Sequence, residues 1–254
     1  MLNKIVALKR QEVEETKAKM PIENYQKVLT TGDHAFAKAL VNMPWALIAE
    51  CKLASPAKGR LCKDYSVPEL AKIYEANGAC ALSVHTDQHF LGKLSDLAAV
   101  KQVSSLPILR KEFIIDAYQI YEARAHGADC VLLIAAILTD KELQNFLAIA
   151  KELAMDALVE VHSREELERI NVLPVQLVGL NNRNLKTFET TLETSVKLLP
   201  HCREGRIVIS ESGVGSREDA LLLQHAGVKG ILVGEGLVTA ESIAEQTRQF
   251  ALLK

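Results

Sequence analysis

Short apolar segments recur along this chain at regular intervals, and this repetition is the feature that most constrains its fold. Each segment has the length of a strand and is rich in Val, Ile, Leu and Ala, as expected for a strand that is buried on both faces. The pattern predicts eight strands: Leu47–Lys52, Cys80–Thr86, Pro107–Phe113, Cys130–Ala136, Asp156–Val161, Leu177–Asn182, Arg206–Ser212 and Gly230–Gly236.

Segments with the 3.6-residue spacing of a helix separate these strands, among them Val67–Asn77, Asp116–His126, Thr139–Leu153 and Arg217–Ala226. Alternation of strands and helices predicts an α/β fold with a parallel sheet. Eight units in roughly 210 residues indicate a (β/α)8 TIM barrel, and 254 residues suit its usual size. A doubly wound open sheet is the alternative, but no strand is followed by the G-x-G-x-x-G of its dinucleotide-binding form.

About 45 residues precede the first predicted strand. Leu2–Met20 has the pattern of an amphipathic, charged helix, and Asp33–Val41 that of a second helix with Asp33 as its N-cap. We expect these helices to add to the barrel or to cover its bottom. No linker or low-complexity segment is visible, so residues 1–254 are predicted to form a single barrel domain, with residues 1–45 as an N-terminal helical extension.

Charge, hydropathy and cysteine spacing limit the kinds of partner and the cell compartment that this protein can have. The formal net charge of −2 argues against a nucleic-acid-binding surface, and no apolar run approaches the roughly 18 residues of a membrane helix. The first residues lack the apolar core of a secretory signal, and the five cysteines show no C-x-x-C spacing. We therefore expect a cytoplasmic protein with reduced thiols, no membrane or nucleic-acid partner and no obligate protein partner. The seven histidines form no H-x-x-H or H-E-x-x-H pair, so no metal site is predicted.

Charged and amide residues stand where the predicted strands end, and active sites of barrels lie at the C-terminal ends of the strands. Glu50 and Lys52 are two residues apart and so share one face of a strand. Other polar residues at strand ends include Lys111, Glu160, Asn181, Arg183 and Glu211. Lysines and carboxylates that converge on one mouth favour acid–base chemistry. His85, near the end of the second strand, is expected to be a polar residue of the rim.

Glycine-containing loops follow the last two predicted strands. Ser212-Gly213 and Gly234-Glu235-Gly236 occupy the positions at which barrel enzymes commonly bind phosphate through backbone N–H groups. The Glu235 carboxylate would repel a phosphate unless it points away. The residues alone thus predict a barrel enzyme that acts on a phosphorylated small molecule.

Several strand ends resemble motifs of the indole-3-glycerol phosphate synthase family, and in the same order along the chain. Ala49–Gly59 resembles its E-x-K-x-x-S-P-S-K-G signature. Leu109–Ile114 resembles L-R-K-D-F-I, and Ala157–His162 resembles A-L-V-E-V-H. Gly179–Leu185 resembles G-I-N-N-R-N-L, and Ser210–Gly213 resembles S-E-S-G. The match extends over essentially the whole chain.

The resemblance implies a cofactor-independent reaction of tryptophan biosynthesis. The enzyme would convert 1-(2-carboxyphenylamino)-1-deoxyribulose 5-phosphate to indole-3-glycerol phosphate, carbon dioxide and water. Lys111 would be the general acid for condensation, and Glu160 a base or electrostatic partner. Lys52 with Glu50 would serve the later dehydration. Asn181 would orient the sugar hydroxyls or hold the carboxylates in place.

The resemblance also implies the residues that bind the substrate. The anthranilate pocket would be walled by Phe113, Leu132, Ile134 and Leu232. Arg183 would lie beside the substrate carboxyl, and Ser55, Phe90 and Glu211 would also contact the substrate. The phosphate would be held by Ser212, Gly213, Gly234 and Glu235.

Two other functions are left open. One is a different phosphate-binding barrel enzyme such as phosphoribosylanthranilate isomerase, which relies on a cysteine–aspartate pair. The lysines at positions 52 and 111 argue against it. The other is a non-catalytic barrel that serves as a scaffold. A scaffold would be expected to lose its proton-transfer groups, whereas here the main candidates are all present.

Overall fold

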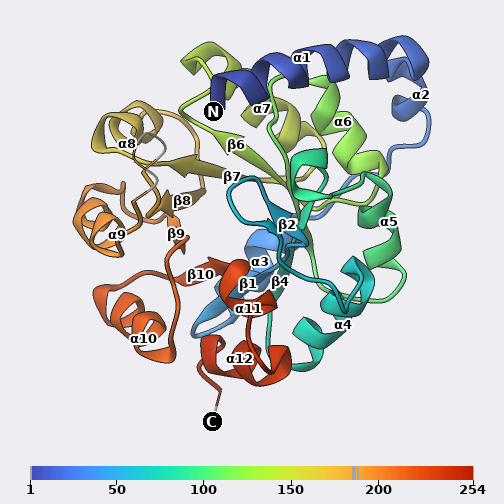
Figure 1. Ribbon diagram of the computed structural model, residues 1–254. Helices are drawn as coiled ribbons and strands as arrows, with labels where there is room; N and C mark the ends of the chain where they lie inside the picture. Colours follow the sequence, from blue (N-terminus) through green and yellow to red (C-terminus); the bar gives the residue numbers. More distant parts are fainter. Residues whose placement is uncertain (1, 185–186, 188, 254) are drawn as a thin grey trace.

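Eight parallel strands close into a barrel in the computed structural model of this protein, which describes residues 2–184, 187 and 189–253 (Figure 1). Each strand pairs with its neighbours in chain order, and β1 pairs with both β4 and β10, which closes the ring. The predicted (β/α)8 barrel is confirmed. The strands are β1 (Ala46–Cys51), β4 (Ala81–His85), β5 (Ile108–Lys111), β6 (Cys130–Ile134), β7 (Asp156–Val161), β8 (Leu177–Asn181), β9 (Ile207–Glu211) and β10 (Gly230–Val233).

Three predicted strands extend two or more residues too far at their C-terminal ends. Cys130–Ala136 is one, since its strand β6 ends at Ile134. The last was expected to reach Gly236, but Glu235 begins the short helix α11 (Glu235–Val238). The third was expected to reach Phe113. Its strand β5 ends at Lys111, and the backbone N–H of Phe113 donates to the Glu112 carboxylate at 2.8 Å. All three errors lie at the barrel mouth, where the chain leaves the sheet to form the loops of the site.

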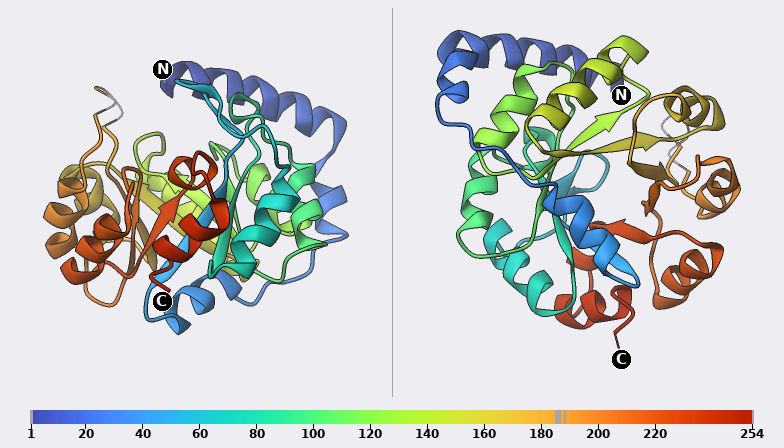
Figure 2. Two further views of the ribbon diagram at one scale, coloured as in Figure 1. Left: turned by 60° about the horizontal axis from the view of Figure 1, so that its bottom comes forward. Right: turned by 180° about the vertical axis from the view of Figure 1, so that it is seen from behind.

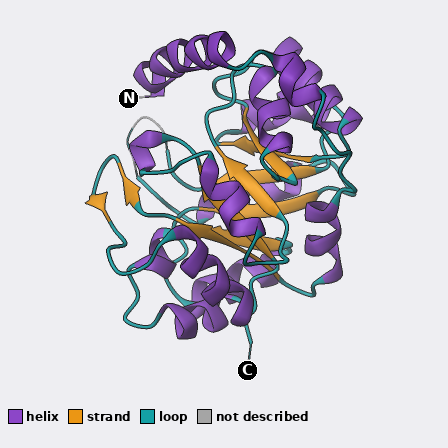
Figure 3. Ribbon diagram, turned by 90° about the vertical axis from the view of Figure 1, so that its right-hand side faces the viewer, coloured by secondary structure: helices purple, strands orange, loops and turns teal. Residues whose placement is uncertain are grey.

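Helices between the strands form the outer ring of the barrel (Figures 1 and 2). They are α4 (Val67–Ala76), α5 (Ser95–Lys101), α6 (Tyr118–Ala125), α7 (Asp140–Glu152), α8 (Arg164–Asn171), α9 (Glu193–Leu198), α10 (Arg217–Ala226) and α12 (Ile243–Phe250). The 3-10 turns are η1 (Gln88–Phe90) and η2 (Leu199–His201). A hairpin of β2 (Ala54–Ser55) and β3 (Gly59–Arg60) stands apart from the barrel strands, within the loop after β1 (Figure 3).

The N-terminal extension consists of α1 (Leu2–Lys19), α2 (Ile22–Gln26) and α3 (Ala35–Asn42). Helices α1 and α3 pack against different parts of the barrel. Helix α3 lies across the bottom, as the view from behind shows, and contacts β1, β4, β7 and β9 (Figure 2). Helix α1 instead packs beside α6 (Figure 1). The prediction of a cover for the bottom is therefore confirmed for α3.

The predicted N-cap of this bottom helix is wrong. His34, not Asp33, occupies the cap position, with a left-handed φ of 56° and no capping hydrogen bond from its side chain. The buried carboxylate of Asp156, at the start of β7, accepts a hydrogen bond from the Ala37 N–H at 2.8 Å and lies 3.0 Å from His34 Nδ1. A carboxylate from a distant strand thus meets the helix N-terminus, where negative charge is favourable.

Side chains inside the barrel change from apolar at the bottom to polar at the top. Phe36 and Leu40 of α3 pack beneath a layer that includes Ile48, Leu109 and Leu158. Because alternate residues of a strand share a face, the next inward positions hold charged groups. Among the described residues no helix is both long and apolar enough to cross a membrane.

Candidate active site

A pocket of about 430 Å³ opens at the C-terminal ends of the strands. It is lined by sixteen of the predicted site residues: Glu50, Lys52, Phe90, Lys111, Phe113, Leu132, Ile134, Glu160, Asn181, Arg183, Glu211, Ser212, Gly213, Leu232, Gly234 and Glu235. Ser55 is not among the lining residues, and its hydroxyl accepts a hydrogen bond from the Lys58 N–H at 3.2 Å. Leu185, the last residue of one family-like segment, lies outside the described residues.

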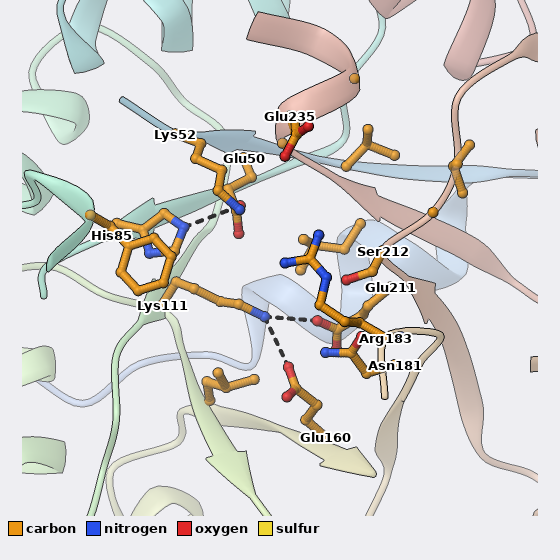
Figure 4. Close-up of a pocket in the computed structure, with 18 of the residues that line it drawn as sticks. Glu50, Lys52, His85, Lys111, Glu160, Asn181, Arg183, Glu211, Ser212 and Glu235 are labelled. Carbon is orange, nitrogen blue, oxygen red and sulfur yellow. Dashed lines mark hydrogen bonds and ion pairs between the residues drawn. The ribbon is translucent and has the colours of Figure 1, made fainter. Parts of the chain in front are cut away.

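Lys111 lies at the centre of the pocket, between two carboxylates from other strands (Figure 4). Its Nζ donates to Glu211 Oε2 at 2.7 Å and to Glu160 Oε2 at 3.1 Å. Burial alone would lower the pKa of Lys111, but the charges of Glu211, Glu160 and Glu50 outweigh it and hold that pKa above its usual value. The lysine is therefore held as an ammonium group, which is the protonated form that a general acid requires.

The two carboxylates around Lys111 have opposite pKa shifts. Burial raises the pKa of Glu211 to about 7, against the attraction of Lys111 and with the repulsion of Glu160. Burial would also raise the pKa of Glu160, but Lys111 and His162 outweigh it and hold that pKa below its usual value. Neighbouring groups whose pKa values are driven apart mark candidate acid and base pairs. Glu211 can exchange a proton near neutral pH, while Glu160 stays ionised.

A glycine on β8 makes room for the Glu211 carboxylate. A Cβ built on Gly179 would lie only 2.0 Å from Glu211 Oε1. Gly234, after β10, has the same relation to Glu50, since a Cβ at this position would overlap sterically with the Glu50 carboxylate. Both carboxylates thus lean over a glycine of the adjacent strand, and any larger residue there would push them away.

His162 lies behind Glu160 and was not predicted as a site residue. Its Nε2 is 3.1 Å from Glu160 Oε1, and its Nδ1 is 3.3 Å from Glu166 Oε2. Burial would lower the pKa of His162, but the two carboxylates raise it to about 9. A sequence signal existed, because His162 follows Glu160 by two residues and so continues its inward face.

Glu50, Lys52 and His85 lie across the pocket from Glu160 (Figure 4). They form a second cluster with Phe90, which stacks on His85. Glu50 Oε1 is 3.5 Å from Lys52 Nζ and 3.1 Å from His85 Nε2. Burial would raise the pKa of Glu50, but His85 and Lys52 hold it well below its usual value. The expectation that His85 is a rim residue is wrong, because its side chain is only 6% exposed and lines the pocket.

The loops after β9 and β10 form the far edge of the pocket. Ser212 and Gly213 both have left-handed φ values, 65° and 85°. The buried Asn182 holds this loop, because its Nδ2 donates to the Ser212 carbonyl at 2.9 Å. The Glu235 carboxylate pairs with Lys58 of the loop after β1. That pairing offsets the negative charge which would otherwise oppose a phosphate at this edge.

Helix α1 reaches the outer side of the mouth through Lys9. The Lys9 Nζ lies 2.8 Å from Asp87 and 3.0 Å from Glu112, and all three side chains are buried. Burial would lower the pKa of Lys9, but Glu112 and Asp87 outweigh it and hold that pKa above its usual value. No sequence signal distinguished Lys9 from the other charges of the predicted helix, because its partners come from strand ends about eighty and a hundred residues away.

Comparison with known proteins identifies full-length relatives. A family model described as indole-3-glycerol phosphate synthase matches residues 2–250. An indole-3-glycerol phosphate synthase of Desulforamulus reducens is 46% identical, and the match covers 99% of this chain and 97% of that protein. One from Neisseria meningitidis is 44% identical over 96% of each chain.

Solved structures of other enzymes share the fold at low identity. The 3-hexulose-6-phosphate synthase of Salmonella typhimurium superposes with a TM-score of 0.63 and 12% identity, over 82% of this chain and 97% of that one. A second structure of 3-hexulose-6-phosphate synthase gives a TM-score of 0.65 at 14% identity, with 82% and 98% covered. These likenesses support the barrel fold alone.

Proposed function

Because this chain belongs to the indole-3-glycerol phosphate synthase family, we propose that its pocket closes the indole ring by proton transfers among buried lysines and carboxylates. The enzyme is a carboxy-lyase of tryptophan biosynthesis. Its substrate, 1-(2-carboxyphenylamino)-1-deoxyribulose 5-phosphate, yields indole-3-glycerol phosphate, carbon dioxide and water. No described cysteine lines the pocket, so the alternative with a cysteine–aspartate pair is not favoured.

The first step is the attack of the carboxyl-bearing ring carbon on the ketone. Lys111 donates a proton to the ketone oxygen as the new carbon–carbon bond forms. The observation that carries this assignment is the placement of Lys111 Nζ between Glu160 and Glu211 at the pocket centre. Glu160 remains ionised and balances the ammonium charge. Glu211, whose pKa is raised to about 7, returns the proton to Lys111.

Loss of carbon dioxide restores the aromatic ring, and a hydroxyl must then leave. Lys52 and Glu50 form the second pair of proton donor and acceptor, and both line the pocket. Lys52 protonates the departing hydroxyl, while Glu50 takes a proton from the carbon next to the ring nitrogen. Two separate lysine–carboxylate pairs thus suit the two proton donations that the reaction requires.

The remaining groups bind the substrate. Leu132, Ile134 and Leu232 are buried residues that line the pocket, and with Phe113 they form an apolar wall for the anthranilate ring. Asn181 orients the sugar hydroxyls, and Arg183 lies beside the carboxyl. The phosphate is held by the backbone of the loops at Ser212-Gly213 and Gly234-Glu235. Phe90 and Glu211 complete the binding surface. Ser55 acts only through the loop that carries Lys58.

The enzyme acts on a small phosphorylated substrate. We propose that the chain works as one barrel domain without a cofactor, nucleic acid or obligate protein partner. The five cysteines are free thiols, which suits a reducing compartment such as the cytoplasm.

Turnover of the purified protein with the carboxyphenylamino-deoxyribulose phosphate tests the assignment. Indole fluorescence should appear at an enzymatic rate and remain unchanged when a metal chelator is added. A folded protein that binds inorganic phosphate but forms no indole would refute the synthase activity. A rate that falls with chelator would refute the cofactor-free mechanism.

A further inference from the structure

His85 completes a closed ring of contacts around the dehydration pair. Its Nε2 lies 3.1 Å from Glu50 Oε1, and its ring stacks on Phe90 with centroids 4.4 Å apart and planes 7° from parallel. Lys52 Nζ closes the ring of contacts, because it lies 3.5 Å from Glu50 Oε1 and 5.5 Å from the centroid of the Phe90 ring. His85 therefore contacts the carboxylate directly and the lysine through the aromatic ring.

Glu50 is buried, so its contact with His85 affects both the charge and the position of the Glu50 carboxylate. The Glu50 side chain is only 4% exposed, so its charge depends on protein partners rather than on water. Ser83, two residues before His85 on β4, donates to the other oxygen, Oε2, at 3.3 Å. Glu50 Oε1 is shared by His85 and Lys52, so the imidazole fixes the position at which the carboxylate meets the lysine.

We propose that His85 is a positioning residue that holds Glu50 and Lys52 in the geometry needed for dehydration. The inference rests on the proposed function of this pair. In that step the bond between the ring carbon and the hydroxyl oxygen breaks, and the hydroxyl leaves as water with a proton from Lys52. The adjacent carbon gives a proton to Glu50, and its electron pair forms the double bond of the five-membered ring. His85 transfers nothing to the substrate.

The Lys111 cluster makes its own ion pairs, and Glu50 adds to them through its charge rather than through a contact with His85. Lys111 pairs with Glu160 and Glu211, which come from β7 and β9, whereas His85 contacts a residue of β1 and one of η1. Loss of His85 should therefore leave condensation and decarboxylation nearly intact and slow only the elimination of water. The rate of carbon dioxide release in the same protein therefore serves as an internal control for the rate of water elimination.

The test is a single-turnover experiment with excess enzyme that follows both products. Carbon dioxide is measured from substrate labelled in the carboxyl group, and indole by its fluorescence. In His85→Phe, which keeps an aromatic ring against Phe90 but loses the nitrogen, we expect indole formation to slow about tenfold to hundredfold. Carbon dioxide release should stay near the wild-type rate, and a decarboxylated intermediate that retains the hydroxyl should accumulate.

Further variants separate positioning from general damage. His85→Gln, which offers an amide donor to Glu50, should recover much of the lost indole rate. His225→Gln replaces an exposed histidine of α10 and should behave as wild type. Lys111→Ala should slow both products together, because condensation precedes both.

Each possible result either supports or overturns the positioning role of His85. Equal slowing of carbon dioxide and indole in His85→Phe would overturn the proposal, as would wild-type rates for both products. Failure of His85→Gln to exceed His85→Phe would also overturn it, since positioning requires a polar group in contact with the Glu50 carboxylate. Absence of both products from the wild-type protein would instead refute the proposed function.

Discussion

Gly179→Ala should disable the Lys111 cluster without touching a charged residue. The added Cβ would lie 2.0 Å from Glu211 Oε1, whereas ordinary contact begins at 3.4 Å. The carboxylate must therefore move by about 1.4 Å, and a misplacement of about 1 Å costs on the order of 10²-fold in rate. This loss corresponds to about 2.7 kcal/mol of activation free energy. The same movement disturbs the 2.7 Å hydrogen bond from Lys111 to Glu211.

The assay is kcat for indole formation, combined with a double-mutant cycle. If Gly179 acts only by making room for the Glu211 carboxylate, the alanine should cost little further activity in a Glu211→Ala background. Thermal unfolding of each variant shows whether the barrel itself survives the substitution. Near wild-type turnover in Gly179→Ala would refute the reasoning, as would additive losses in the double variant.

Three further changes test other parts of the structure. Lys111→Ala should lower kcat by at least about 10²-fold, and Lys111→Arg should fail to restore it because arginine is not readily tuned to release a proton; near-normal kcat in either variant would contradict the assignment of Lys111 as the general acid. His162→Gln should remove a stabilisation on the order of 3 kcal/mol, since the pKa of His162 is raised from 6.5 to about 9. That stabilisation is fully present below pH 6.5 and is lost as the pH rises through about 9, so urea unfolding of the two proteins should converge across this window; a gap that is constant with pH would argue against the ion pair. Lys9→Met leaves Asp87 and Glu112 buried without their shared cation and should lower the free energy of unfolding by about 3 kcal/mol; an unchanged urea midpoint would show that the α1 contact is dispensable.

The repeated apolar segments in the sequence were sufficient to predict the barrel fold. Strands buried on both faces give continuous apolar segments, and glycines such as Gly227, with a φ of 98°, mark helix ends. The inward face could also be followed, because alternation places Leu109 and Lys111 on one side of β5. These features depend on residues a few positions apart, so the sequence displays them directly.

Contacts between distant segments could not be predicted in this way. The cap of α3 is a carboxylate from β7, although Asp33 stands in the expected place in the sequence. Lys9 is buried against Asp87 although its own helix is largely exposed. His85 was expected to be a rim residue, and only the closure of β1 against β4 brings it to Glu50.

The sequence by itself determined which groups could perform the chemistry, and the tertiary structure decided which of them act together. Periods of two and 3.6 residues are properties of a single strand or helix, so they place Lys111 and Glu160 at the mouth. Which charged side chains contact one another depends on the register of neighbouring strands and on the free space beside those side chains. The absence of a side chain at Gly179 leaves room for the Glu211 carboxylate. Burial and the charge of Glu160 then raise the pKa of Glu211 to about 7, against the attraction of Lys111.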